Sequence, residues 1–359
     1  MDHRARKSGS ILLTLLGLTL GLPGTGVVAA LPAAGPAAFQ SKATTARPAT
    51  TAAKARATAK KTPTVSKKAA PKASTYARKS PVRRKAPVVK QAPFPRFKTD
   101  ENGKLVPDLR AAAAIIYNPE TNEVIWEEHS NDQRSIASIT KVMTAVVFLE
   151  SEPDMTREVV IDAADTYRAS WTYLRAKERI KLGDLFHLLL VASDNAAARA
   201  LARLSPWGSD GFVQRMNEKA AELGLTSTVY TDPSGLDAAN VSSAYDMARL
   251  IAYVAGDERI SSIMRLPSYT YRSSRRQFTI KSTNQFVRTG EVDVLSGKTG
   301  FIRKSGYCFA TLLKLREVGP QLAVVVLGAR SNAARFTETR NLLKWLSATA
   351  SEVFVKEPQ

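Results

Sequence analysis

Three short motifs bring together the residue types needed for acyl transfer by a serine. They are Ser138-Ile-Thr-Lys141, Ser193-Asp-Asn195 and Lys298-Thr-Gly300, with Ser193 lying 55 and Lys298 lying 160 residues after Ser138. A serine hydroxyl is a weak nucleophile until a neighbouring base takes its proton. Each motif alone is common in helix caps, turns and strand ends. The ordered set predicts a serine acyl-transfer site.

Lys141 is the candidate base for Ser138. The pattern of residues 135–150 predicts an amphipathic helix, and side chains three residues apart on a helix share a face with Cβ atoms about 5–6 Å apart. A lysine amine accepts a proton only if burial or a second cation lowers its pKa. Lys298 is the candidate second cation. This chemistry uses no cofactor and no metal, and we expect neither.

The three histidines fit a Ser-His-Asp triad poorly. His3 lies in the N-terminal targeting segment, His129 follows the end of an expected strand, and His187 lies in an apolar run. Activation of the serine without histidine is therefore the more economical interpretation.

The first thirty residues have the layout of a secretory signal peptide: basic residues, an apolar stretch at 11–22, then small residues. The apolar stretch is short for a membrane span, although an uncleaved anchor stays an alternative. We expect an exported, periplasmic protein, with loose association with the membrane or wall as a further option.

The net charge of +20 is concentrated near the N-terminus, because residues 1–99 hold 20 Lys and Arg but one acid. Residues 31–99 are rich in Ala, Pro and Lys and have few large apolar side chains, which predicts a disordered basic linker. In an exported protein its partners would be anionic envelope polymers and not nucleic acid. The alternative is a spacer without a partner.

Residues 100–359 are expected to form the catalytic domain, with an α+β fold. Strands are predicted at residues 112–117, 124–127, 269–272, 278–282, 298–303, 306–315 and 322–329, and helices at 135–150, 182–192, 195–204, 211–223, 244–254 and 333–346. Strands at both ends with helices between them predict an antiparallel sheet flanked by helices, with an inserted helical subdomain. Cys308, the only cysteine, is predicted to be a buried strand residue.

The three motifs resemble the signature set of penicillin-binding proteins and serine β-lactamases. Within that group the strings at residues 135–144, 188–197, 231–236 and 297–301 resemble the low-molecular-weight D-alanyl-D-alanine carboxypeptidases and endopeptidases of peptidase S11 type. The resemblance covers about residues 105–350 and leaves out the basic linker. It implies the penicillin-binding protein fold, with Lys-Thr-Gly on an edge strand and Ser-Asp-Asn on the helical lobe.

The resemblance also implies roles for the motif residues. Ser138 would attack the carbonyl between two D-alanines to form an acyl-enzyme, and Lys141 would take its proton. Ser193 would relay that proton to the leaving amine. Asn195 would hold the substrate amide and Lys141, and Lys298 would set the local potential.

The remaining substrate contacts follow from the same resemblance. The oxyanion hole would consist of the backbone N–H groups of Ser138 and Ile302, beside Gly300. Thr299 would bind the terminal carboxylate of the substrate together with Arg335. Arg330 and Arg303 are alternatives to that arginine.

Three functions stay open at this point. A class A β-lactamase would need a Glu-x-x-Leu-Asn loop after the middle motif, which the sequence lacks, so β-lactams are expected to be covalent inhibitors. Endopeptidase cleavage of cross-linked stem peptides is favoured over carboxypeptidase activity, because the strand around Phe301 and Tyr307 resembles the endopeptidase branch and 59 residues follow Gly300. An inactive wall-binding module is the third alternative.

Overall fold

The structure is a computed structural model that describes residues 94–315 and 319–354. The predicted signal peptide and residues 31–93 of the predicted linker lie outside these ranges. Within them, no helix has an apolar stretch that would reach across a bilayer.

The folded part begins earlier than the expected boundary at residue 100. β1 (Phe97–Thr99) pairs antiparallel with β2 (Leu105–Pro107). The Asn341 side chain holds the backbone of Arg96 on both sides, since its Oδ1 accepts from Arg96 N at 2.6 Å and its Nδ2 donates to Arg96 O at 2.8 Å. Residues 97–99 therefore belong to the folded part and not to the linker.

A five-stranded antiparallel sheet joins the two ends of the folded part, as predicted. Its strand order is β11 (Asp293–Ile302), β12 (Gly306–Lys314), β13 (Gln321–Ala329), β3 (Ala113–Asn118) and β4 (Glu123–Glu128). Since β11 is at one edge, one side of its backbone is free of strand pairing. The Lys-Thr-Gly motif lies on this edge strand, as expected.

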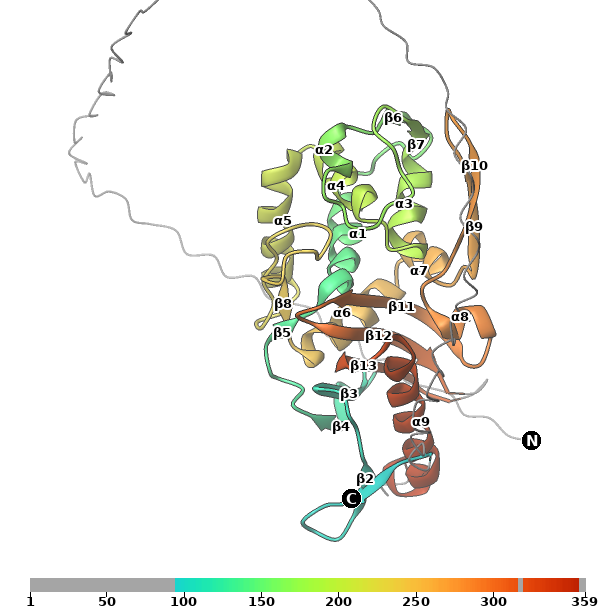
Figure 1. Ribbon diagram of the computed structural model, residues 1–359. Helices are drawn as coiled ribbons and strands as arrows, with labels where there is room; N and C mark the ends of the chain where they lie inside the picture. The colour runs from blue at the N-terminus through green and yellow to red at the C-terminus, as the bar shows by residue number, and fades with distance from the viewer. Residues whose placement is uncertain (1–93, 316–318, 355–359) are drawn as a thin grey trace, which may run out of the picture. The chain divides into compact units, whose positions relative to one another are not determined.

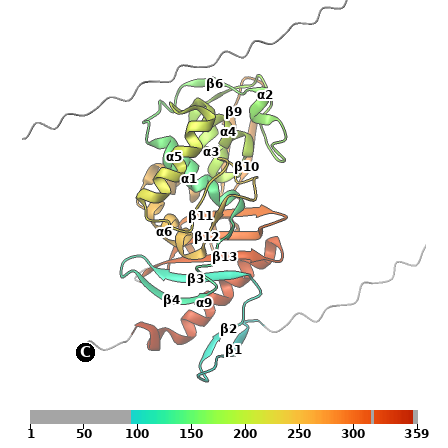
Figure 2. The same cartoon turned by 90° about the vertical axis from the view of Figure 1, so that its left-hand side faces the viewer.

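Both faces of the sheet are covered, which explains why its central strands are apolar throughout. Alternate residues face opposite sides: Cys308, Ala310 and Leu312 contribute to the core shared with the helices, whereas Leu313 packs into a second core with α9 (Asn332–Phe354). Figures 1 and 2 show α9 on one face and the helices between residues 141 and 264 on the opposite face.

The inserted segment forms a helical lobe, so the α+β prediction is confirmed. Its helices are α1 (Lys141–Leu149), α2 (Ala163–Thr166), α3 (Leu182–Val191), α4 (Asn195–Leu204), α5 (Gly208–Glu222), α6 (Ala244–Ala255) and α7 (Glu258–Met264). Asp194 caps α4 by accepting from Ala197 N at 2.9 Å. The Ser-Asp-Asn motif thus fills the junction between α3 and α4.

The continuous amphipathic helix predicted at residues 135–150 is wrong. A two-residue strand, β5 (Arg134–Ser135), precedes a 3₁₀ turn, η1 (Ala137–Thr140), and only then does α1 begin. Ala137 has φ +49°, which no helix accommodates. All nine residues of α1 are buried because the helix runs through the centre of the lobe, so it has no polar face.

Candidate active site

Ser138 and Lys141 meet where η1 runs into α1. Lys141 Nζ lies 2.9 Å from Ser138 Oγ. The residue before the serine, Ala137, is held at positive φ, and such strained backbone often accompanies functional sites. Gly235 (φ +76°) packs against this turn so tightly that a Cβ there would lie 2.0 Å from Ala137 O. The loop of residues 231–236 therefore supports the turn that carries the serine.

The Lys141 amine has three hydrogen-bond partners. Besides Ser138 Oγ, it contacts Asn195 Oδ1 at 2.6 Å and Ser234 O at 2.5 Å. The Asn195 amide nitrogen donates to Ala169 O at 2.8 Å, which fixes its oxygen toward the lysine. A neutral amine has two N–H groups and one lone pair. The two oxygen acceptors use both N–H groups, so the lone pair is left for the serine hydroxyl.

Burial lowers the pKa of Lys141 to about 7, against the opposing attraction of Asp232 and Asp194. The side chain is completely buried. Burial, rather than the second cation expected from the sequence, is thus the main cause of its low pKa. At neutral pH a large fraction of the amine is free to act as a base.

The rate of acylation is therefore expected to depend on pH around 7. Protonation of Lys141 below its pKa removes the lone pair, so kcat/KM should fall about tenfold per pH unit below 7 and level off above it. Stopped-flow acylation by a chromogenic cephalosporin between pH 5 and 9 measures this directly. A flat profile across that range would remove Lys141 from the role of base.

Lys298 is the second buried lysine, on β11. Its Nζ donates to Ser193 Oγ at 2.7 Å and to Thr299 O at 2.9 Å. Burial, followed by repulsion from Lys141 and Arg335, holds the pKa of Lys298 well below its usual range. Ser193 has φ +61°, so strained backbone also places this hydroxyl. Each of the two lysines thus contacts one serine hydroxyl: Lys141 that of Ser138, and Lys298 that of Ser193.

The rest of the edge strand lies directly against the nucleophile. A Cβ at Gly300 would lie 2.6 Å from Ile136 O and 3.1 Å from Ser138 N, so only glycine allows this approach. Thr299 Oγ1 lies 2.6 Å from the hydroxyl of Thr283, which is just before α8 (Gln285–Thr289). The two hydroxyls form a polar pair on the cavity wall.

The predicted role of the Ile302 N–H in the oxyanion hole is wrong. This group donates to Ser305 Oγ at 3.1 Å within the hairpin between β11 and β12. Successive N–H groups of a strand point to opposite sides, so the N–H of Phe301 faces the open edge. Thr299, two residues earlier, agrees with this alternation, because its carbonyl accepts from Lys298 Nζ at the open edge. The prediction therefore placed the N–H group of the oxyanion hole one residue too late, at Ile302 instead of Phe301.

Two of the three candidate arginines line the cavity. Arg335, in the first turn of α9, is 6% exposed and donates to Gly300 O at 3.0 Å and Asn332 Oδ1 at 2.5 Å. Burial lowers the pKa of Arg335 to about 10. Arg303 also lines the cavity, whereas Arg330 is exposed and does not.

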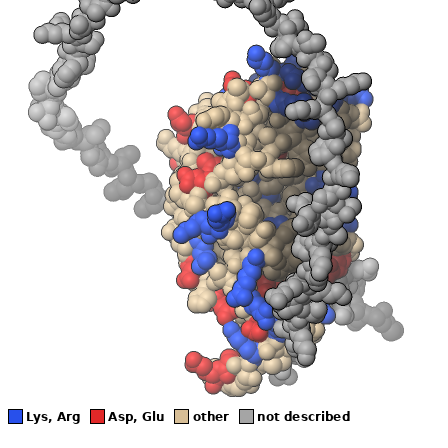
Figure 3. All heavy atoms as spheres, viewed as in Figure 1, with Lys and Arg blue, Asp and Glu red and all other residues tan. Residues whose placement is uncertain are grey.

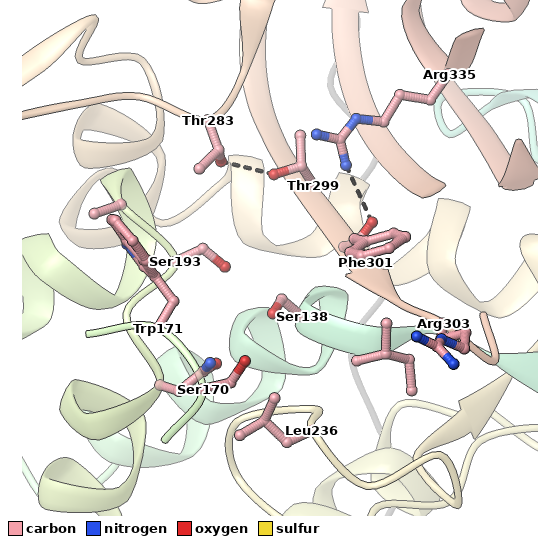
Figure 4. Close-up of a pocket in the computed structure, with 14 residues that line it drawn as sticks. Ser138, Ser170, Trp171, Ser193, Leu236, Thr283, Thr299, Phe301, Arg303 and Arg335 are labelled. Carbon is pink, nitrogen blue, oxygen red and sulfur yellow. Dashed lines mark hydrogen bonds between the residues drawn. The ribbon is translucent and has the colours of Figure 1, made fainter. Parts of the chain in front are cut away.

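The cavity has a volume of about 480 Å³, and Figure 4 shows Ser138 near its centre. Its wall includes seven predicted site residues: Ser138, Ser193, Asn195, Thr299, Gly300, Ile302 and Arg335. Lys141 and Lys298 lie buried behind it. Leu236, from the string at residues 231–236, also lines the cavity, as do Ser170, Trp171 and Thr283, which no pattern in the sequence marked.

Of the residues that the structure describes, His129, His187 and Cys308 do not line the cavity. His187 Nδ1 lies 2.7 Å from Gly183 O, and its ring stacks on Tyr269. His129 is exposed beside Asp132, and His3 lies outside the described residues. Cys308 is fully buried in β12, and burial raises the pKa of its thiol.

Asp194, the central residue of its motif, holds the loop that forms one rim of the cavity. Its buried carboxylate accepts from Thr172 Oγ1 at 2.9 Å and Tyr173 N at 2.6 Å, in addition to capping α4. Burial raises the pKa of Asp194, and these hydrogen bonds oppose the shift. Asp194 thus supports the site without reaching the cavity.

Together, the sheet with its helical lobe, the serine, the two buried lysines and the arginines on the cavity wall define a serine hydrolase that works through an acyl-enzyme. Comparison with known proteins identifies the family. The chain belongs to the D-alanyl-D-alanine carboxypeptidase family, peptidase S11, whose family model matches residues 100–331.

Individual relatives agree with this assignment. The chain is 33% identical to a D-alanyl-D-alanine endopeptidase of Haemophilus influenzae, over 68% of this chain and 85% of that protein. It is 27% identical to the D-alanyl-D-alanine carboxypeptidase DacF of Bacillus subtilis, over 68% and 64%. Penicillin-binding protein D2 of Listeria monocytogenes, solved with cefotaxime bound, superposes with a TM-score of 0.59 at 27% identity, over 67% of this chain and 98% of that one.

Proposed function

We propose that the protein is a penicillin-sensitive serine D-alanyl-D-alanine peptidase that cuts peptidoglycan stem peptides, chiefly as an endopeptidase on cross-links. One observation carries the proposal. The buried Lys141 Nζ lies 2.9 Å from Ser138 Oγ, and its other two partners, Asn195 Oδ1 and the Ser234 carbonyl, are acceptors. Among the described residues, the wall of the adjoining cavity has two arginines, Arg303 and Arg335, and no carboxylate.

In the proposed reaction, Ser138 Oγ attacks the carbonyl carbon of the penultimate D-alanine while Lys141 takes the hydroxyl proton. The N–H groups of Ser138 and Phe301 bind the developing oxyanion. The C–N bond then breaks, and Ser193 passes a proton to the leaving amine. Water hydrolyses the resulting ester and restores the serine.

Thr299 and Arg335 would bind the carboxylate next to the scissile bond. Thr299 is on the cavity wall, and the Arg335 guanidinium is fixed by the Gly300 carbonyl of the edge strand and by Asn332 Oδ1. The residue that leaves carries a carboxylate next to the scissile amide nitrogen in both cases, whether it is a terminal D-alanine or the D-configured residue of a cross-link. The carboxylate contact alone is therefore compatible with both carboxypeptidase and endopeptidase activity. The higher identity to an endopeptidase, 33% against 27% to a carboxypeptidase, supports cleavage of cross-links.

Slow deacylation after attack on a β-lactam follows from the same cavity. A class A β-lactamase uses a glutamate as the base for the water that hydrolyses the penicilloyl ester, and no described carboxylate lines the cavity to take that role. The nearby Asp232 is occupied, because its oxygens accept from Ser234 N at 2.6 Å and Asp237 N at 2.7 Å. The site therefore supports covalent capture of penicillin and disfavours a β-lactamase. The cefotaxime-bound relative supports the same conclusion.

Digestion of purified sacculi tests the proposed function. Mass analysis of the released muropeptides should show cross-linked dimers converted to monomers, with less loss of terminal D-alanine from pentapeptides. The Ser138→Ala protein serves as the blank. If dimers persist while penicillin still labels Ser138, endopeptidase activity is ruled out and the carboxypeptidase alternative takes its place.

We further propose that the protein is exported and that its basic segment binds anionic envelope polymers. The support is the sequence: a signal-peptide layout and a positive charge concentrated before residue 100. The neutralised groups would be wall phosphates, lipid head groups or lipopolysaccharide.

Deletion of residues 31–93 should weaken binding to sacculi or anionic vesicles severalfold and leave hydrolysis of a small soluble peptide unchanged. The deletion stops at 93 because β1 belongs to the fold. The difference should shrink as salt rises from 0.05 to 0.5 M, since screening shortens to a few Å. Co-sedimentation of both proteins measures it. Equal pelleting at every salt concentration would reduce the segment to a spacer.

A further inference from the structure

An exposed aromatic loop forms the rim of the cavity on the side of the helical lobe. Tyr167 and Trp171 are 65% and 64% exposed, and Trp171 lines the cavity that contains Ser138. Large exposed aromatic side chains lose water when a partner covers them, so their exposure beside a substrate cavity points to a ligand.

The loop is held rigidly, although it has no regular structure. Asp194 binds Thr172 Oγ1 and Tyr173 N, and Ala169 O accepts from the site residue Asn195. Arg168 and Ser170, on either side of Ala169, have positive φ values of +48° and +60°. Strained backbone fixed by buried polar groups is typical of a preorganised binding surface.

Trp171 begins a row of aromatic rings that leads away from the cavity. Its ring lies 5.8 Å from that of Tyr173, which lies 5.4 Å from that of Phe278. Phe278 is on the hairpin of β9 (Ser268–Arg272) and β10 (Gln277–Lys281) and is 40% exposed. The Arg276 guanidinium lies 5.6 Å from the ring centre of Phe278.

The surroundings of the row are polar and cationic. Arg276 donates to the carbonyl of Tyr173 and pairs with Glu178 at 3.6 Å, which fixes the hairpin against the loop. Figure 3 shows Lys and Arg side chains gathered at the top of this face, where Figure 1 places β6 (Glu158–Val160), β7 (Arg179–Lys181) and the end of the hairpin. Rings bordered by hydrogen-bond donors suit a ligand with apolar C–H faces and many oxygen acceptors.

We propose that Trp171, Tyr173 and Phe278 form a glycan-binding row that holds the amino-sugar chain to which the stem peptide is attached. This inference rests on the proposed peptidoglycan substrate. The C–H face of a pyranose packs on an aromatic ring, and Arg276, beside Phe278, donates to the hydroxyl and N-acetyl oxygens of the sugar.

The reach of the stem peptide agrees with this placement. Four residues separate the scissile carbonyl from the sugar, and an extended chain of that length spans about 13 Å. A row that begins on the cavity wall and continues by ring steps of 5.8 and 5.4 Å therefore lies within reach of the glycan while D-alanine occupies the site.

Binding measurements on the full chain carrying Ser138→Ala test the row without turnover. The two ligands are a stem pentapeptide and the same pentapeptide on N-acetylglucosaminyl-N-acetylmuramic acid. Trp171, the most exposed of the four tryptophans, should be quenched by the sugar-bearing ligand, which we expect to bind about tenfold more tightly than the free peptide.

Phe278→Leu keeps apolar volume in the hairpin and removes the ring, so it should erase most of the gain from the sugar. Tyr253→Ala removes an exposed aromatic ring on α6, away from the row, and should keep the gain. Equal affinities for the two ligands would overturn the proposal, and so would a gain that survives both Phe278→Leu and Trp171→Ala. If the active protein still cuts the free peptide in that case, the glycan row fails and the proposed peptidase function stands.

Discussion

Ser138→Ala should abolish both capture of penicillin and hydrolysis of D-alanyl-D-alanine peptides, with a loss of at least about 10⁴-fold in kcat. The hydroxyl is the nucleophile in the proposed reaction, and no other described hydroxyl lies against the Lys141 amine. Gel fluorography with a labelled penicillin and a D-alanine release assay measure the two losses.

The fold should survive this change. The Ser138 side chain contacts the lysine and lines an open cavity, so its removal leaves no large void. The melting temperature should shift by a few degrees at most. Ser262→Ala, on the exposed side of α7, is the matched control and should retain full activity. Turnover by a folded Ser138→Ala protein above the background of buffer would refute the mechanism.

The fold could be predicted because its elements are long and strongly patterned. β12 and β13 appear as apolar runs because α9 covers one face and the lobe covers the other. Asp194 and Ser243 mark the starts of α4 and α6 by capping them. These local signals and the tertiary structure agree, so the predicted and observed bounds of β12, β13, α4 and α6 differ by at most one residue, whereas α9 extends eight residues beyond its predicted end at residue 346.

Short elements fixed by distant contacts could not be predicted. η1 exists because Gly235, about a hundred residues later, packs against Ala137 and holds its positive φ. The strands of the two-stranded pairs β6–β7 and β5–β8 (β8, Val241–Ser242) are only two or three residues long, too short for any periodicity to show. Such segments are specified by tertiary packing rather than by local pattern.

The candidate site likewise has a part that the sequence predicts and a part that it does not. The motif residues come together as expected: Lys141 and Asn195 begin α1 and α4, and Lys298 lies on the edge strand β11. The motifs did not reveal the contacts that support these residues: the Ser234 carbonyl on Lys141, the Phe301 N–H at the strand edge, and the loop fixed by Asp194. These contacts use backbone groups, which every residue has and no sequence pattern distinguishes.

The second large effect is expected for Lys141→Arg, which keeps a positive charge but should slow acylation by about 10³-fold or more. A guanidinium stays protonated at any accessible pH, so it has no lone pair for the Ser138 proton. It is also larger than the amine, which is enclosed by oxygens at 2.5 to 2.9 Å on three sides. Both effects point in the same direction.

The pH dependence separates loss of the base from a general disturbance of the site. In the unmodified protein acylation should rise as Lys141 loses its proton near pH 7, whereas in Lys141→Arg the residual rate should not show this rise. Lys219→Arg is the matched control, since Lys219 forms surface ion pairs with Glu150 and Glu222 and should tolerate the exchange. If Lys141→Arg instead acylates at near-normal rate with an unchanged pH profile, then Lys141 is structural. The base would then be sought at Lys298, whose amine is likewise buried and 2.7 Å from a serine hydroxyl.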